Sequence, residues 1–158
     1  METQLSLTPL LVVRDAATAI QFYVDALGAK ELVRCVNRPL NTVGHADLSL
    51  GNSTFSITEE LRAFNSDAPP SLGGSPVVLQ LQVDDVETLL ARMCQAGAHL
   101  VLPLQEFCGE PMARLRDPWG HLWIISECLE LLSPAEKQQR RDTLLSKLAS
   151  PETTMKRP

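Results

Sequence analysis

Residues 13–29, VRDAATAIQFYVDALGA, and residues 83–98, VDDVETLLARMCQAGA, decide the fold because they carry one pattern twice. Each begins near an aspartate suited to cap a helix, Asp15 or Asp85, and closes at a glycine suited to end one, Gly28 or Gly97. Apolar residues recur between these ends at helical spacing. A unit present only twice is too sparse for a solenoid, which needs about three repeats. The pattern therefore predicts two copies of one βαβββ module in a single α+β fold.

Strand-like runs surround both predicted helices and set the domain organisation. We expect one domain over residues 1–150, with module 1 at about 6–60, a breaker-rich linker at 61–75 and module 2 at about 76–130. Ser133-Pro134-Ala135-Glu136 has the form of a capping box with proline at the first helical position, so a C-terminal helix is expected at about 134–149. Residues 151–158 are expected to be disordered.

Composition excludes several classes of protein. The chain of 158 residues is 44% hydrophobic and 21% charged, as is typical of one globular domain, and its net charge of −5 disfavours a nucleic-acid or anionic-membrane partner. No apolar run is long enough to span a membrane, and the N-terminus lacks the pattern of a signal peptide. Cysteine spacing matches no metal site, so we expect a cytoplasmic protein whose reduced thiols mostly pack as small apolar groups. These cysteines are Cys35, Cys94, Cys108 and Cys128.

Two longer phrases carry a family resemblance. Residues 11–32, LVVRDAATAIQFYVDALGAKEL, and residues 115–123, LRDPWGHLW, resemble the vicinal oxygen chelate superfamily of glyoxalases, bleomycin-resistance proteins and extradiol dioxygenases. Shorter phrases at 45–48, 73–76, 109–110, 114–118 and 133–136 resemble its PhnB-like subgroup. The resemblance implies that each module curls its sheet into a half-barrel and that the two enclose a pocket. It also implies a homodimer. Function does not follow, because one fold hosts several chemistries.

Enzymes of this superfamily hold a divalent metal through His, Glu or Gln on four strands. Mapped by spacing from the two aspartates and from Gly120, the four positions fall on Thr8, Phe55, Val78 and Ile124, with Phe55 uncertain by one or two residues. A transition metal needs three or four nitrogen, carboxylate or thiolate ligands. One hydroxyl cannot replace them, so we expect no metal and no other cofactor.

Other side chains are candidates for contact with a ligand. His45 and Asp47 stand two apart on one strand and share a face, where they either orient a ligand or face solvent. Glu110 and Arg114 flank the strand after a loop and either meet a ligand or form a solvated ion pair. Three aromatic residues are candidates for stacking walls or for the core. They are Phe55, Phe107 and Trp123.

Three functions remain open from the sequence. The first is a metal-independent protein that binds a drug-like or metabolite ligand, as the bleomycin-resistance proteins do. The second is a lyase or isomerase that uses His45 and Asp47 or displaced metal ligands. The third is an interaction protein whose pocket has collapsed around Phe55, Ile124 and Trp123.

Overall fold

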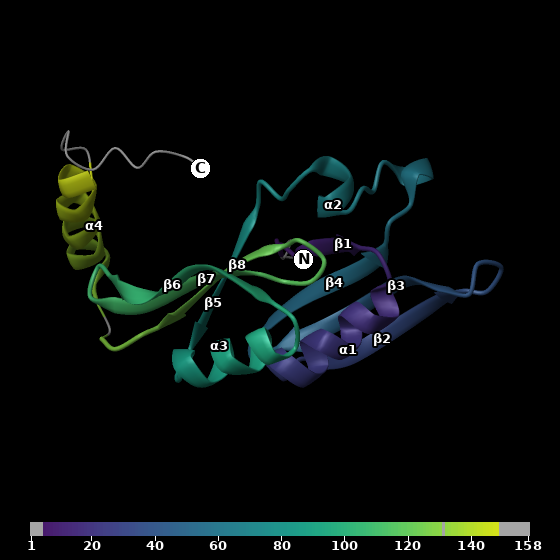
Figure 1. Cartoon of the computed structure of the whole chain (residues 1–158), viewed down its shortest axis with the longest axis horizontal. Coiled ribbons are helices and arrows are strands. Elements are labelled where there is room, and N and C mark those ends of the chain that lie inside the picture. Colours follow the sequence, from purple (N-terminus) through teal and green to yellow (C-terminus); the bar gives the residue numbers. More distant parts are fainter. Residues whose placement is uncertain (1–4, 131, 149–158) are drawn as a thin grey trace.

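The computed structural model describes residues 5–130 and 132–148, and they form two βαβββ modules followed by a helix (Figure 1). Module 1 comprises β1 (Leu10–Val13), α1 (Ala16–Leu27), β2 (Lys30–Asn37), β3 (Thr42–Leu50) and β4 (Ser53–Glu59). Module 2 comprises β5 (Val78–Val83), α3 (Val86–Gln95), β6 (His99–Phe107), β7 (Glu110–Arg116) and β8 (Leu122–Glu127). Between them lie a 3₁₀ turn, η1 (Arg62–Phe64), and a short helix, α2 (Pro69–Leu72).

The predicted α+β fold and its C-terminal helix are confirmed. That helix is α4 (Pro134–Leu148), and its capping box is formed: the Ser133 hydroxyl donates to Glu136 at 2.6 Å. Residues 151–158, which we expected to be disordered, lie outside the described residues. Within those that are described, no helix is long and apolar enough to cross a membrane.

Each module builds its own four-stranded mixed sheet, in the order β1-β4-β3-β2 and β5-β8-β7-β6. The first strand of each module pairs in parallel with the last, with Leu10 opposite Ser56 in module 1 and Gln80 opposite Ile124 in module 2. The remaining pairs are antiparallel. The two registers therefore superpose one module on the other residue by residue.

Both modules also begin their helices in the same way. The aspartate N-caps Asp15 and Asp85 accept from the backbone N–H groups of Thr18 and Thr88 at 3.2 and 2.9 Å. A glutamate at the end of the last strand accepts further N–H groups of the first turn: Glu59 from Ala16 at 2.8 Å, and Glu127 from Val86 at 3.3 Å. The anionic side chains match the partial positive charge of a helix N-terminus.

Helices α1 and α3 cover one face of the two sheets, seen along the lower side of Figure 1. The core lies between these helices and the sheets. We call the opposite face of each sheet its open face. Because side chains alternate along a strand, residues of β4 and β8 divide between core and open face. Phe55 and Ile57 belong to the core, and so do Trp123 and Ile125.

A buried carboxylate joins the two modules within this core. Asp117, 1% exposed, accepts a hydrogen bond from the Tyr23 hydroxyl of α1 at 2.6 Å and from the Trp123 indole at 2.9 Å. Its other oxygen accepts the backbone N–H groups of Trp119 and His121, which fixes the turn at Asp117–Gly120. Burial raises the pKa of Tyr23 well above its usual value, and the charge of Asp117 adds to this effect.

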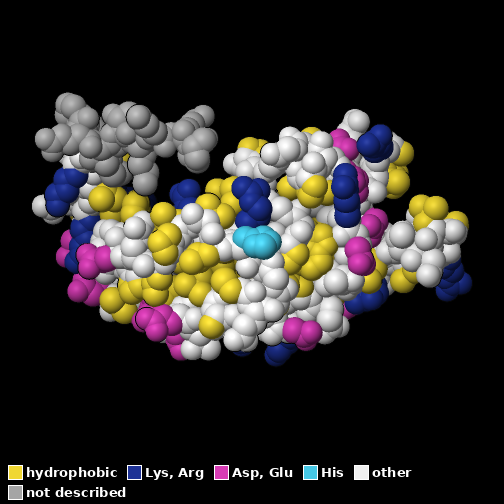
Figure 2. All heavy atoms as spheres, in the orientation of Figure 1, with side chains coloured by type: hydrophobic (Ala, Val, Ile, Leu, Met, Phe, Trp, Pro, Cys, Tyr) yellow, Lys and Arg dark blue, Asp and Glu magenta, His cyan; other side chains and the backbone are white. Residues whose placement is uncertain are grey.

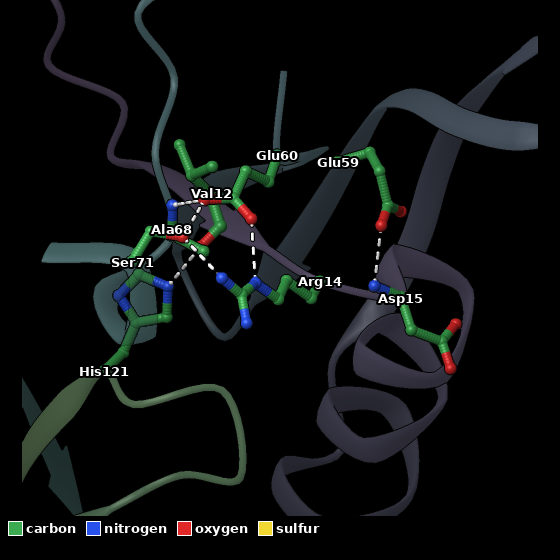
Figure 3. A network of polar contacts seen from close by, with 8 residues as sticks. All are labelled: Val12, Arg14, Asp15, Glu59, Glu60, Ala68, Ser71 and His121. Carbon is green, nitrogen blue, oxygen red and sulfur yellow. Dashed lines mark hydrogen bonds and ion pairs between the residues drawn. The ribbon is translucent and has the colours of Figure 1, made fainter. Parts of the chain in front are cut away.

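The linker is fastened to module 1 by a second polar network, around Glu60 (Figure 3). The Arg14 guanidinium donates to Glu60 at 2.8 Å and to the Ser71 hydroxyl at 2.6 Å, while Ser71 and the Ala68 N–H both donate to the other Glu60 oxygen. These bonds, with that from Ser71 as the largest cause, lower the pKa of Glu60 to about 2. His121 reaches across from module 2 to the Val12 carbonyl oxygen, which its Nε2 approaches to 3.0 Å.

The expectation that the cysteines mostly pack as small apolar groups is wrong. Cys35 and Cys94 are exposed, and Cys108 and Cys128 are only half-buried. Cys35 lies on the outer strand β2, and Cys94 lies on the solvent side of α3. At these two positions the hydrophobic periodicity of the sequence does not distinguish a buried thiol from an exposed one.

Removing the Tyr23 hydroxyl tests the bridge between the modules. We expect Tyr23→Phe to lower the free energy of unfolding by about 1–3 kcal/mol, because Asp117 keeps its buried charge and loses a donor. Urea denaturation measures the change. Ser53→Ala, which removes an exposed hydroxyl bonded only to Asn52, is the control and is expected to change stability by less than about 0.5 kcal/mol. Equal effects of both variants would contradict the bridging role.

The depressed pKa of Glu60 predicts a pH-dependent contribution to stability. A carboxylate whose pKa falls on folding stabilises the protein above its unfolded value of 4.5, and this contribution is lost as the pH falls toward about 2. We therefore expect Glu60→Gln to lower the denaturation midpoint at pH 7, with a difference from wild type that shrinks below about pH 4.5. Exposed Glu106, on β6, supplies the control Glu106→Gln. A Glu60→Gln deficit that is constant with pH would refute the prediction.

Candidate functional site

A cavity of about 560 Å³ lies on the open face of module 2, between the sheet and α4. Its floor is made of side chains that alternate onto this face from β5, β7 and β8. The floor combines two apolar side chains, Met112 and Ile124, each 8% exposed, with the polar side chains of Gln80, Gln82 and Ser126. The volume lies in the range of small-molecule sites in proteins.

The β6–β7 hairpin and α4 form the walls of this cavity. The hairpin contributes Phe107, Cys108 and Glu110, and α4 contributes Lys137, Arg140 and Arg141. Among the described residues that line the cavity, the charged ones are mostly cationic. They are Arg114 and the three α4 residues, against one carboxylate, that of Glu110. Figure 2 shows Lys and Arg side chains at the left end of the molecule, over α4, beside a band of hydrophobic surface.

Arg140 ties α4 to the hairpin. Its guanidinium donates to the Cys108 carbonyl oxygen at 3.4 Å and to Glu130 at 2.8 Å. Gly109 permits this approach, because a Cβ atom there would lie 2.4 Å from an Arg140 nitrogen. Gly109 also has a φ of +86°, a backbone conformation that other residues adopt only with strain.

Three of the predicted ligand contacts, Phe107, Glu110 and Arg114, come together in this cavity. Glu110 and Arg114 are not within ion-pair distance of each other. The other predicted aromatic residues, Phe55 and Trp123, line none of the cavity. They pack in the core against Tyr23, with ring centroids 5.4 and 5.9 Å away.

The predicted pair His45 and Asp47 lies on the open face of module 1, away from this cavity. The His45 imidazole contacts the Asp47 carboxylate at 2.9 Å, and the Ser56 hydroxyl donates to the same oxygen at 2.6 Å. The bond from Ser56, and next that from His45, lowers the pKa of Asp47. Both partners bond to the aspartate and not to each other, so His45 is not placed to activate Ser56 as a nucleophile.

The strand registers identify the two open faces as equivalent surfaces with different side chains. Asp47 lies opposite Ser56, and Arg114 lies opposite Ile124. Since Ser56 and Ile124 lie opposite Leu10 and Gln80, Asp47 is the counterpart of Arg114. The duplicated frame thus presents a carboxylate in one module where it presents a guanidinium in the other.

The same registers correct the second of the four metal positions. The residue equivalent to Ile124 is Ser56, not Phe55, whose side chain points into the core. The corrected set is Thr8, Ser56, Val78 and Ile124, which offers two neutral hydroxyls and two hydrocarbon side chains. These residues do not fit a divalent transition metal. No group of three or more His, Cys, Asp or Glu side chains within residues 5–130 and 132–148 could hold a metal elsewhere.

Comparison with known proteins agrees with this architecture. The model of the glyoxalase/bleomycin resistance protein/dioxygenase superfamily matches residues 6–125. The chain belongs to this superfamily. An uncharacterised protein of Mycobacterium tuberculosis is 38% identical over 126 residues, which cover 77% of this chain and 74% of that protein.

Solved structures show the same fold. TioX from Micromonospora sp. ML1 is 26% identical with a TM-score of 0.60, over 78% of this chain and 100% of that one. A PhnB protein from Bacillus cereus is 16% identical with a TM-score of 0.62, over 78% of this chain and 100% of that one. These relatives support the assignment of the fold, and they do not identify a ligand for this chain.

Sequence reasoning missed the contribution of α4 and the polar floor. Lys137, Arg140 and Arg141 stand at i, i+3 and i+4 on one helix face, a pattern that is visible in the sequence but ordinary for a solvated surface. Gln80 and Gln82 share a strand face in the same way. Nothing in the sequence places that helix face opposite that strand face.

Ser56 gives a direct test of the electrostatics of module 1. A hydrogen bond to the ionised carboxylate favours ionisation, so we expect Ser56→Ala to raise the pKa of Asp47 toward its ordinary value. Carbon-detected NMR titration of the Asp47 carboxyl measures the shift. Ser53→Ala, on the same strand but without a bond to Asp47, is expected to leave this pKa unchanged. An unchanged pKa in Ser56→Ala would show that His45 alone determines it.

Proposed function

We propose that this protein is a metal-independent small-molecule binding protein whose ligand occupies the cavity between the open face of module 2 and α4. The main support is the cavity itself, about 560 Å³ and lined by both apolar and polar side chains. Such a surface binds a compact organic molecule by burying its apolar body and orienting it through a few polar contacts.

The residues at the metal positions support the metal-independent part of the proposal. Ile124 is one of them, and it forms part of the apolar floor. A ligand here contacts a hydrocarbon side chain at the point where a metalloenzyme of the superfamily would offer a carboxylate. The size of the cavity also argues against the collapsed-pocket alternative, since Phe55 and Trp123 lie in the core instead of filling it.

The enzyme alternative would depend on His45, paired with Asp47 on the open face of module 1. This arrangement suits proton transfer by the imidazole, but neither His45 nor Asp47 lines the cavity of module 2. We therefore favour binding. A PhnB-like affiliation and a homodimer belong to the same proposal, and sedimentation equilibrium tests the dimer against the chain mass of 17.4 kDa.

An uncharged aromatic probe tests the proposed binding site. We expect N-phenyl-naphthylamine to show saturable fluorescence enhancement with one site per chain, unaffected by EDTA. Ser126→Trp, which places an indole in the cavity, is expected to weaken binding about tenfold or more, because the cavity is filled. Ser126→Ala keeps the cavity and is the matched control.

Gln80→Trp is a second variant that fills the cavity, here from β5. Two such variants keep the test decisive if one of them fails to fold. Circular dichroism and thermal unfolding confirm that each variant is folded. Absence of saturable binding to the wild-type protein, or equal binding by folded Ser126→Trp and Gln80→Trp, would overturn the proposal.

A further inference from the structure

We propose that the ligand of this cavity carries an anionic group, such as a carboxylate, sulfonate or phosphate, which is bound by Arg114 together with Lys137 and Arg141 of α4. The inference rests on the proposed binding function and adds the chemical class of the ligand. It comes from cations that line the cavity and whose side chains have no partner among residues 5–130 and 132–148.

Arg114, Lys137 and Arg141 line one cavity from two elements far apart in the sequence. Within residues 5–130 and 132–148, no side-chain hydrogen bond or ion pair is formed by any of these three cations. Arg140, between them on α4, is by contrast paired with Glu130. The chain as a whole has a net charge of −5, so the positive charge gathered at this cavity is opposite in sign to the net charge of the chain.

The helix face that carries these cations is fixed in direction. Residues at i, i+3 and i+4 share one side of a helix, so Lys137 and Arg141 follow the orientation of Arg140. Arg140 is held at the hairpin by the Cys108 carbonyl oxygen and by Glu130. Its two neighbours are therefore directed over the cavity, where Arg114 rises from the sheet.

An anion would offset the positive charge around this cavity. Like charges held around one cavity repel one another, and among the described residues that line it Glu110 is the only acidic one. An anion that enters relieves this repulsion and gains charge-assisted hydrogen bonds. Met112 and Ile124, each 8% exposed, offer apolar surface beside the cations. A ligand with an apolar body and one anionic end matches both surfaces.

Two probes that differ only in charge test the inference. Anilinonaphthalene sulfonate is N-phenyl-naphthylamine with one added sulfonate, so the ratio of their dissociation constants isolates the anionic group. We expect the sulfonate to bind wild type about tenfold or more tightly, in keeping with hydrogen bonds to charged groups. We also expect this advantage to fall as salt is raised.

Neutral variants assign the advantage to the named cations. Arg114→Gln and the double variant Lys137→Gln/Arg141→Gln are each expected to weaken binding of the sulfonate at least about threefold more than they weaken binding of the uncharged probe, so that the ratio falls. Arg38→Gln is the matched control, because Arg38 lies in the β2–β3 turn at the other end of the molecule (Figure 1) and its loss changes net charge equally.

The outcomes separate this inference from the proposed function. If the uncharged probe binds and the sulfonate has no advantage, or if Arg38→Gln lowers the ratio as much as Arg114→Gln, the anionic class is wrong and the binding site stands. If neither probe binds saturably, both proposals are wrong. If the sulfonate advantage survives in Arg114→Gln and in the double variant, its binding site lies elsewhere and the inference is overturned.

Discussion

The rest of the structure depends on the buried carboxylate of Asp117. A charge taken out of water is costly unless donors surround it, and here the Tyr23 hydroxyl, the Trp123 indole and two backbone N–H groups do so. Tyr23 belongs to module 1 and the other donors to module 2. The carboxylate therefore holds the module 1 helix against the module 2 turn. Phe22, Phe55 and Trp119 pack around this junction edge to face or tilted, which excludes water from it.

This junction lets the duplicated frame serve two purposes. The helix-covered faces of both sheets repeat the same apolar packing, whereas the open faces differ. Asp47 with His45 and Ser56 occupies one open face, and Arg114 with Met112 and Ile124 occupies the other. Side chains on an open face do not support the core, so they can vary in charge without loss of the fold. At equivalent positions one repeat thus has a carboxylate, Asp47, and the other a guanidinium, Arg114.

The sequence was sufficient for features that depend on local rules. The N-caps Asp15 and Asp85, the Asp117–Gly120 turn and the Ser133–Glu136 capping box follow from short-range hydrogen bonds that neighbouring residues determine. It was insufficient where register matters. Ser53–Glu59 alternates, with Phe55 and Ile57 on one face and Thr54, Ser56 and Thr58 on the other, but this alternation does not say which residue lies opposite Leu10 on β1. Asp117 looked like an ordinary turn residue, since its main partner Tyr23 is 94 positions away.

The candidate site depends on α4, which lies outside the duplicated part of the chain. The two modules by themselves supply the floor and one guanidinium, that of Arg114, and α4 adds the remaining cations. The helix is attached through Arg140, which donates to Glu130 and to the Cys108 carbonyl oxygen beside Gly109. Under the proposed function, chemical selectivity at this site is separable from the fold: the modules determine where a ligand is buried, and an appended helix determines which charge it meets. For this reason, membership of the superfamily identifies the fold, whereas the charge of the proposed ligand depends on side chains within residues 132–148.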